Sequence, residues 1–209
     1  SEIIGFEDWQ NKVEIGGEGK SYGIEFFLQK KRGKTTGWIG YTCSWSWRKF
    51  QNVNQGEWYP YKYDRRHDFS LVFSHKFNEK FDIGLTWVYG TGSNITMMDA
   101  RYPEFGFNGN IDLSSNKLNE IQYYSSRNNY RMSPYHRLDF GVNFHKKKSW
   151  GERTWSIGAY NAYNRKNPYY IYFDDEATFN SDGTYTTESV AKQVSLFPII
   201  PSISYYFNF

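Results

Sequence analysis

Two pairs of side chains have the residue types that general acid–base catalysis uses. His67 is followed directly by Asp68, and His136 is followed three positions later by Asp139. A catalytic base works only when its partner lies within hydrogen-bond reach. Both pairs fall in segments with strand-like alternation, where residues one or three positions apart point to opposite faces. We therefore expect members of a polar network here, and the sequence predicts no catalytic residue and no enzyme.

The sequence predicts neither a cofactor nor a metal site. Its four His residues lack the spacing of a metal centre. The segment DDEATFNSDGTY (174–185) clusters carboxylates but lacks the spacing of a calcium-binding EF-hand loop. Within it, Asp182-Gly183 is typical of a hairpin turn. The single cysteine, Cys43, excludes an internal disulfide, and we expect it to be a small side chain in an apolar series.

Aromatic side chains in the polar connecting segments are better candidates for binding. Tyr and Trp with Asn, Arg and Asp nearby suit recognition of a ligand by stacking and hydrogen bonding. The candidate ligand contacts are Trp58, Tyr59, Tyr61, Phe105, Phe107, Tyr123 and Tyr124. The alternative interpretation is that these rings pack on one another to order the loops, or anchor the chain at a membrane interface.

The composition restricts the class of protein that can position such residues. The chain has 209 residues, a formal charge of +3, 39% hydrophobic residues and 21% aromatic ones. Ordinary soluble cores are built from aliphatic residues, in which this chain is poor. No stretch approaches the roughly 20 apolar residues that a membrane helix needs. The nearly balanced charge gives no support to a nucleic-acid partner.

Alternation with a period of two is the dominant pattern and predicts an all-β fold. In KFDIGLTWVYG, for example, Phe81, Ile83 and Leu85 alternate with Asp82 and Gly84. Such alternation is the signal of a strand with one polar and one apolar face. About seven strands are predicted in this way, over 20–31, 36–50, 63–77, 80–91, 134–147, 153–173 and 190–209.

The connections between these strands alternate in length. Short ones contain KRGKT, NEK and KKKSWGE, whereas the polar segments 51–62, 92–133 and 174–189 are long. Short turns on one side and long loops on the other are typical of an antiparallel transmembrane β-barrel in the outer membrane. The apolar face would contact the lipid bilayer, and the charged side chains would face a wet lumen. The candidates for lumen-facing residues are Glu25, Arg48, Asp68, Asp82, Arg137 and Asp139.

Six segments carry a resemblance to a known family: GKSYGIEFFLQKKRGKTTGWIGYT, YPYKYDRRHD, WVYGTG, YHRLDFGVNFHKKKSWGERTW, NAYNRKNPYY and LFPIIPSISYYFNF. Together they resemble the C-terminal part of a TonB-dependent outer-membrane receptor, in the subgroup that carries a carboxypeptidase-regulatory-like domain. The resemblance spans residues 16–209. It implies that residues 1–209 form the C-terminal strands of a larger barrel of about 22 strands, with short periplasmic turns and long extracellular loops.

The same resemblance implies the partners and the location. The plug and the coupling segment that contacts TonB are absent from these residues, so both would lie in the remainder of the receptor. The barrel-assembly machinery would read Tyr205, Phe207 and Phe209 as the assembly signal, and a surface lipoprotein is a further partner. The chain would reside in the outer membrane of a Gram-negative bacterium.

The expected function is therefore part of an active-transport receptor that binds and imports a scarce nutrient. Two alternatives stay open at this point. One is a complete small barrel of about eight strands with a structural or adhesion role. The other is an outer-membrane hydrolase, for which a nucleophile and a base on one face are lacking.

Overall fold

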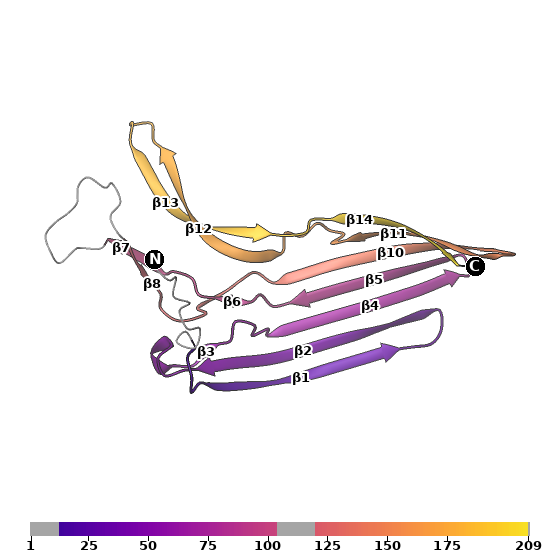
Figure 1. The fold of residues 1–209 in the computed structure, drawn as a ribbon, viewed down its shortest axis with the longest axis horizontal. Coiled ribbons are helices and arrows are strands. Elements are labelled where there is room, and N and C mark those ends of the chain that lie inside the picture. Colours follow the sequence, from indigo (N-terminus) through magenta and orange to yellow (C-terminus); the bar gives the residue numbers. More distant parts are fainter. Residues whose placement is uncertain (1–12, 104–119, 209) are drawn as a thin grey trace, which may run out of the picture. The chain divides into compact units, whose positions relative to one another are not determined.

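The computed structural model describes residues 13–103 and 120–208, and within them the chain is all-β and antiparallel. This confirms the predicted fold class at that level. The large sheet has the strand order β1-β2-β4-β5-β10-β11-β14, with the short β3 (Tyr59–Pro60) paired to β2 (Figure 1). Its strands are β1 Glu18–Lys30, β2 Thr35–Lys49, β4 His67–Asn78, β5 Phe81–Gly90, β10 Tyr135–Lys148, β11 Gly151–Tyr160 and β14 Ile200–Asn208.

The chain divides into two compact units. The described parts of Ser1–Tyr22, Ser44–Asp64 and Ser93–Met132 form the first, here called the loop unit. The described parts of Gly23–Cys43, Arg65–Gly92 and Ser133–Phe209 form the second, the sheet unit. The loop unit holds a one-turn 3-10 helix, Asn54–Gly56, and two short ribbons. These ribbons pair β6 (Asn94–Ile95) with β9 (Tyr130–Arg131) and β7 (Ala100–Pro103) with β8 (Glu120–Tyr123).

One face of the sheet unit is apolar across all its central strands. Leu71 lies opposite Ile39 on one side and opposite Trp87 on the other, and Trp87 lies opposite Leu138. Directly opposed residues of an antiparallel pair project to the same face, so these side chains form a continuous row. Parallel rows are Phe73–Leu85–Phe140–Ala159, Val142–Ile157–Ile203 and Phe144–Trp155–Tyr205.

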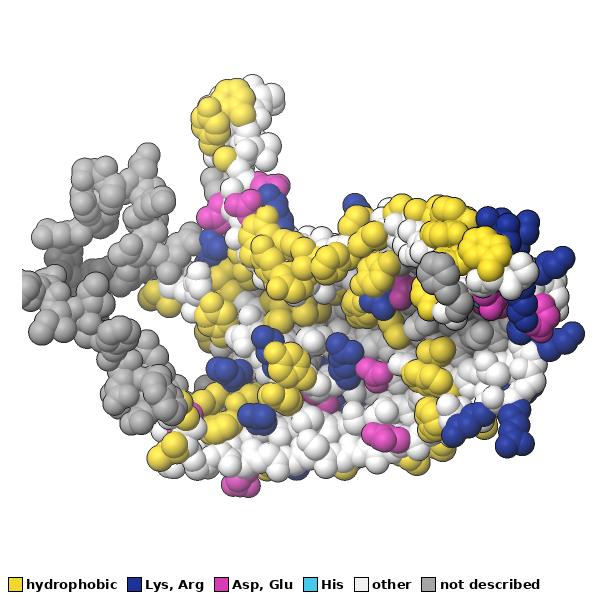
Figure 2. Space-filling view, turned by 45° about the vertical axis from the view of Figure 1, so that its right-hand side comes forward, with side chains coloured by type: hydrophobic (Ala, Val, Ile, Leu, Met, Phe, Trp, Pro, Cys, Tyr) yellow, Lys and Arg dark blue, Asp and Glu magenta, His cyan; other side chains and the backbone are white. Residues whose placement is uncertain are grey.

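Aromatic rings gather at both ends of this apolar face. At the end with long connections, the ring of His136 stacks on Tyr89 at 6.3 Å between centroids and approaches Tyr163 at 5.5 Å. At the end with short turns, Phe81 lies 5.4 Å from Phe144, and Trp155 lies 4.7 Å from Tyr205. Figure 2 shows Lys and Arg side chains gathered at this short-turn end. The apolar face is thus framed by two aromatic bands.

The prediction for the sixth and seventh strands and for the segment between them was wrong. Segments 153–173 and 190–209 are not continuous strands, and 174–189 is not an irregular loop. Instead β12 (Pro168–Phe179) and β13 (Tyr185–Ser195) pair with each other as a separate two-stranded hairpin. At the break after β11, Asn161 and Asn164 adopt left-handed backbone conformations at φ 52° and 53°. Gly183 at φ 85° forms the hairpin turn, as the Asp182-Gly183 pair predicts.

Few apolar side chains are buried in the described part of the chain. Tyr59 and Ala159 are the buried hydrophobic residues, whereas Phe140, Ile157 and Ile203 on the sheet are 44, 48 and 67% exposed. Among the described residues, no helix has the length and apolar character needed to cross a membrane.

Candidate functional site

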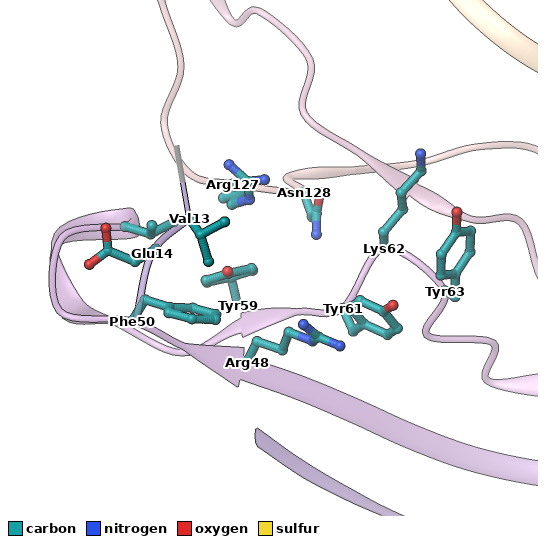
Figure 3. Close-up of a pocket in the computed structure, with 11 residues that line it drawn as sticks. Val13, Glu14, Arg48, Phe50, Tyr59, Tyr61, Lys62, Tyr63, Arg127 and Asn128 are labelled. Atoms are coloured by element: carbon teal, nitrogen blue, oxygen red, sulfur yellow. The ribbon is translucent and has the colours of Figure 1, made fainter. Parts of the chain in front are cut away.

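A cavity of about 580 Å³ opens in the loop unit and is the strongest candidate for a binding site (Figure 3). Its volume falls within the range of about 300–1,000 Å³ that small-molecule sites occupy. Aromatic rings and cationic groups dominate its walls. The lining residues are Val13, Glu14, Arg48, Phe50, Val53, Tyr59, Tyr61, Lys62, Tyr63, Arg127 and Asn128.

A buried carboxylate fixes the segment that carries the tyrosines. Asp64 is 1% exposed and accepts a hydrogen bond from the backbone N–H of Ser46 at 2.6 Å. The guanidinium of Arg131 lies 2.6 Å from the same carboxylate and also donates to the Asp64 carbonyl at 2.5 Å. A short, charge-assisted contact of this kind is among the stronger interactions a protein makes. The ion pair therefore ties residues 61–64 to both β2 and β9.

A second buried polar side chain secures the same segment from the other side. Asn94 is 2% exposed and donates from Nδ2 to the carbonyl of Tyr61 at 2.9 Å. Its own backbone N–H donates to the carbonyl of Lys62 at 2.9 Å. Buried polar groups are normally paired in this way, since an unpaired one costs free energy.

Hydrogen bonds also hold Arg127 and Asn128 at the cavity. The backbone N–H of Arg127 donates to the Asn54 side chain at 2.8 Å, and Asn128 Nδ2 donates to the carbonyl of Pro60 at 2.7 Å. Asn54 and Asn128 adopt left-handed backbone conformations, with φ values of 54° and 57°. Asparagine tolerates this conformation better than other residues with a side chain, so it suits the tight turns of these loops. The two loops therefore present these side chains in fixed positions.

Asp99 orders the loop segment that carries Arg127. Its carboxylate accepts hydrogen bonds from the Ser125 backbone N–H at 2.6 Å and from Asn129 Nδ2 at 2.9 Å. The Ser125 N–H, a donor that favours the charged form, holds the pKa of the Asp99 carboxyl below its usual value. The segment is thus most ordered when Asp99 is ionised.

The cations of the cavity lie over its aromatic rings at cation–π distances. The guanidinium of Arg48 lies 3.9 Å from the centre of the Tyr61 ring, and that of Arg127 lies 6.0 Å from the centre of the Tyr59 ring. The Lys62 ammonium lies 5.5 Å from the Tyr63 ring. A guanidinium stacked by its face keeps its edge donors available for a carboxylate, sulfate or phosphate. The cavity can therefore bind an anionic group beside an aromatic surface.

A second cavity of about 520 Å³ shares Arg48, Phe50 and Tyr61 with the first. It extends along the first residues of β1, where the Lys20 ammonium lies 4.2 Å from the centre of the Trp58 ring. Because three residues line both cavities, the two are neighbours within the loop unit.

The structure brings together only part of the predicted set of ligand contacts. Tyr59 and Tyr61 line the cavity, whereas Trp58 supports Lys20 and lines neither cavity. Tyr123 packs edge-on against Tyr102 of the β7–β8 ribbon, and Tyr124 donates to Gln122. Phe105 and Phe107 lie outside the described residues, as does Phe209. Sequence reasoning missed Lys62, Arg127 and Asn128, although the cation between the tyrosines of YPYKY was a visible signal.

The residues expected to face a lumen lie on the polar face of the sheet, opposite the apolar rows, or at alternating strand positions that continue this face. Asp68 lies opposite Gly90 and Thr42, and Asp139 lies opposite Thr86, away from the apolar rows. Glu25 alternates with Phe26, whose ring stacks on Tyr41 of the apolar face. Arg48 belongs to the even-numbered series of β2 and reaches the cavity described above. Arg137 donates to Asp139 at 2.9 Å and to the hydroxyls of Tyr135 and Tyr160.

The two candidate acid–base pairs have separate partners. His67 shares a hydrogen bond with the Tyr41 hydroxyl at 2.8 Å, while Asp68 accepts from Arg65 at 3.2 Å. His136 likewise bonds to the Tyr163 hydroxyl at 2.7 Å, and Asp139 pairs with Arg137. Cys43 lies opposite His67 in the register and is half-buried.

A different imidazole–carboxylate contact joins His145 to Asp82, which sequence reasoning did not identify. Nε2 of His145 contacts Asp82, and its Nδ1 shares a hydrogen bond with the Thr154 hydroxyl at 2.9 Å. Asn143 donates to Asp82 at 2.7 Å and accepts from Ser156 at 2.7 Å. The network links β5, β10 and β11 across the polar face of the sheet.

Within residues 13–103 and 120–208, no three His, Cys, Asp or Glu side chains gather as metal ligands. No protein-family model, no curated protein and no solved structure matches the chain.

Proposed function

We propose that this chain forms part of the β-barrel of a TonB-dependent outer-membrane receptor. The receptor binds a scarce nutrient at the cell surface and imports it with energy supplied through TonB. Its loop-unit cavity provides contacts for that nutrient, and its sheet unit spans the bilayer.

The exposed apolar face of the sheet is the observation that carries this proposal. Phe140, Ile157 and Ile203 lie in adjoining rows of that face and are 44, 48 and 67% exposed. A continuous apolar surface of this extent in water would be an aggregation site, so in a stable protein something apolar must cover it. Hydrocarbon chains of lipid would cover it without any specific partner.

The spacing of the two aromatic bands fits such a bilayer. Phe81 and Tyr89 lie at opposite ends of β5 and are separated by about 27 Å along an extended strand. At the strand tilt of about 40° found in barrels, this separation corresponds to a height of about 21 Å. Outer-membrane barrels present an apolar band about 25 Å tall between girdles of aromatic residues.

The opposite face has the chemistry of a wet interior. It carries the Arg137–Asp139 ion pair and the Asp82–His145 network, which would be costly to place in hydrocarbon. In hydrocarbon every backbone group also needs a partner, so an open sheet edge cannot face lipid. Since β1 and β14 are the edges of the large sheet in the described residues, further strands of the receptor would pair with them.

Fractionation and growth experiments in the producing bacterium test the proposal. We expect heat-modifiable protein in the outer membrane, and a growth defect of the gene deletion on a limiting nutrient. Deletion of TonB should reproduce that defect without adding to it. Protein found outside the outer membrane would contradict the proposal, and a defect that does not depend on TonB would favour a structural or adhesion barrel.

A further inference from the structure

We propose that cationic side chains at the short-turn end of the sheet unit bind the headgroup of an anionic glycerophospholipid. This headgroup site consists of Lys146 and Lys148 of β10 and Arg153 of β11. The inference rests on the membrane-spanning function proposed above and names a lipid partner for the sheet unit. It depends on the strand register, on the pairing of charges and on a neighbouring tryptophan.

The register places the three cations on the apolar face of the sheet. Phe144 lies opposite Trp155 in the aromatic band of that face. Two positions further along the same strands, Lys146 lies opposite Arg153, and Lys148 follows after another two positions. Successive side chains of a strand alternate between its faces. The cations therefore continue the face that carries the apolar rows.

The order of side chains along this face follows the depth of a bilayer. Apolar rows come first, then the aromatic band, then the cations, and Figure 2 shows Lys and Arg side chains gathered at this end. Two positions of a strand span about 7 Å, or about 5 Å of height at a tilt of about 40°. Aromatic belts sit at the membrane–water interface. The cations beyond the belt therefore lie at the level of lipid headgroups, where their long side chains reach a phosphate.

The charges of the headgroup site are not balanced within the protein. Among the described residues, no carboxylate lies at ion-pair distance from Lys146, Lys148 or Arg153. Both lysines are exposed, and the arginine is half-buried. Moreover, Lys146 directly opposes Arg153 in the register, and like charges in that arrangement repel each other. A phosphate between them would replace this repulsion with two attractive contacts.

The polar face at the same end of the sheet is arranged differently. Lys147 lies between the two lysines of the headgroup site in sequence, so it projects to the polar face, opposite Glu152. Its ammonium lies 3.6 Å from Glu79, and Lys76 lies 3.0 Å from the same carboxyl group. The lysines of the polar face thus have carboxylates nearby, whereas the cations of the apolar face are left for an external anion.

Trp150 favours a lipid over a free anion as the occupant. It lies in the turn between β10 and β11, is 61% exposed, and packs 5.2 Å from Phe207. The Lys148 ammonium lies 5.9 Å from the Trp150 ring. An exposed indole beside a cation can contact the glycerol and first acyl carbons of a lipid whose phosphate meets the cation. A free phosphate would leave this ring without a contact.

The position of the site selects a phospholipid. Short turns of outer-membrane barrels lie on the periplasmic side, where the leaflet consists of phospholipids. Basic clusters beside membrane-spanning segments bind anionic headgroups. Phosphatidylglycerol, which has one negative charge and an accessible phosphodiester, fits these requirements.

Native mass spectrometry of the full-length protein, purified in detergent from the producing cells, tests the inference. Phosphatidylglycerol is titrated against phosphatidylcholine with the same acyl chains, which keeps the phosphate but has no net charge. We expect phosphatidylglycerol to bind at least about tenfold more tightly. Equal affinities for the two lipids would overturn the inference.

Two further probes identify the source of the phosphate. Displacement of phosphatidylglycerol by an equal concentration of glycerophosphoglycerol, the headgroup without acyl chains, would show that the site binds a free phosphodiester rather than a membrane lipid. Lipid A is compared with cardiolipin, because both carry two phosphates. Tighter binding of lipid A would assign the cations to the opposite leaflet and overturn the choice of a phospholipid.

Variants assign the binding to these residues. Lys146→Gln and Arg153→Gln should each weaken phosphatidylglycerol binding about fivefold and change phosphatidylcholine binding less than about twofold. Lys147→Gln is the matched control, because it removes the same charge from the same strand on the other face. An equal loss in Lys147→Gln would reduce the effect to overall charge and contradict the headgroup site.

A charge reversal guards against a folding defect. Arg153→Glu places a carboxylate opposite Lys146, which exchanges a repulsive cross-strand pair for an attractive one. We expect this variant to keep its heat-modifiable folding and to lose the preference for phosphatidylglycerol. A folded Arg153→Glu protein that keeps the preference would place the lipid elsewhere.

The outcome separates the lipid partner from the receptor function. The growth phenotype and its dependence on TonB are measured in parallel. Equal lipid affinities in a protein with a TonB-dependent phenotype would contradict only the headgroup site. A preference for phosphatidylglycerol in an outer-membrane protein whose phenotype does not depend on TonB would contradict only the transport role.

Discussion

At the scale of single residues, the most consequential side chain of the loop unit is the buried carboxylate of Asp64. It is 1% exposed, accepts the Ser46 N–H and lies 2.6 Å from Arg131. Asp64→Asn would remove the buried negative charge that lies 2.6 Å from the Arg131 guanidinium. We expect a loss of about 1–3 kcal/mol in the free energy of unfolding, measured by urea titration in lipid vesicles.

Asp68→Asn is the matched control for this substitution. Asp68 also pairs with an arginine, Arg65, but both side chains are more than two-fifths exposed. Exposed pairs contribute at most about 1 kcal/mol, because water and salt screen them. Equal losses for the two variants would show that burial of Asp64 is not what stabilises the loops.

Asp99 makes the order of the loops depend on pH. The Ser125 N–H lowers the pKa of its carboxyl in the folded state, so ionised Asp99 stabilises the loop above the ordinary aspartate pKa of about 3.9. This contribution is lost as the pH falls through the lower, folded-state pKa. Hydrogen exchange of residues 97–103 and 120–131, corrected for intrinsic rates, should therefore show less protection in acid.

The variant Asp99→Asn isolates the cause. It should show the low protection of this segment already at neutral pH, and acid should change it little. A variant that keeps the protection of the parent protein at neutral pH would contradict a role for the carboxylate.

At the scale of elements, alternation predicts the strands of the large sheet but not the hairpin. The sheet strands are long, and each has one face of apolar side chains that the register brings into rows, so period two is a strong signal. The end of β11 depends instead on Asn161, which is 1% exposed and donates to the carbonyls of Arg165 and Phe197. No local pattern reveals such a contact between residues 36 positions apart.

The candidate site was predictable to a similar extent. The aromatic character of YPYKY identifies Tyr59 and Tyr61 as candidate binding residues from the sequence alone, and both line the cavity. The cations that complete the cavity come from Arg48 on β2 and from Arg127, which is 68 residues after Tyr59. Hydrogen bonds between the loops bring these groups together, so composition alone could not indicate that cations and aromatic rings line one cavity.

Close packing of β2 against β4 depends on a glycine. A Cβ atom at Gly37 would overlap the carbonyl oxygen of Val72, whereas one at Gly141 of β10 would meet nothing within 4 Å. Gly37→Ala should therefore destabilise the sheet by about 1–3 kcal/mol, the usual range for overpacking. Gly141→Ala is the control and should have a much smaller effect in the same urea titration. If Gly37→Ala costs as little free energy of unfolding as Gly141→Ala, β2 can shift to relieve the overlap.

Neighbouring positions on β4 test which face meets lipid. Leu71 lies in the apolar row opposite Ile39 and Trp87, and Ser70 lies on the other face opposite Gly40 and Val88. In the proposed barrel, Leu71→Arg places a charge in hydrocarbon and should cost about 2–4 kcal/mol. Ser70→Arg places the same side chain in a wet interior and should cost far less. Equal losses in unfolding experiments in lipid would contradict the proposed orientation of the faces.

At the scale of the whole molecule, the unequal connections make the two ends of the sheet chemically different. The three short turns consist of 31–34, 79–80 and 149–150, and basic residues surround them. The longer connections carry the cavity and the β12–β13 hairpin. In the proposed orientation the short turns face the periplasm and the long connections face the outside, which is the arrangement typical of outer-membrane barrels.

Cysteine labelling of intact cells tests this orientation with two serines in exposed turns. Ser181 lies in the turn between β12 and β13, and Ser149 lies in the turn between β10 and β11. In a Cys43→Ser background, Ser181→Cys should react with a membrane-impermeant maleimide on intact cells, because its turn would be extracellular. Ser149→Cys should react only after the outer membrane is permeabilised. If only Ser149→Cys reacts on intact cells, the orientation is the opposite of the proposed one. The cavity would then open to the periplasm, where it could not capture a nutrient from the medium.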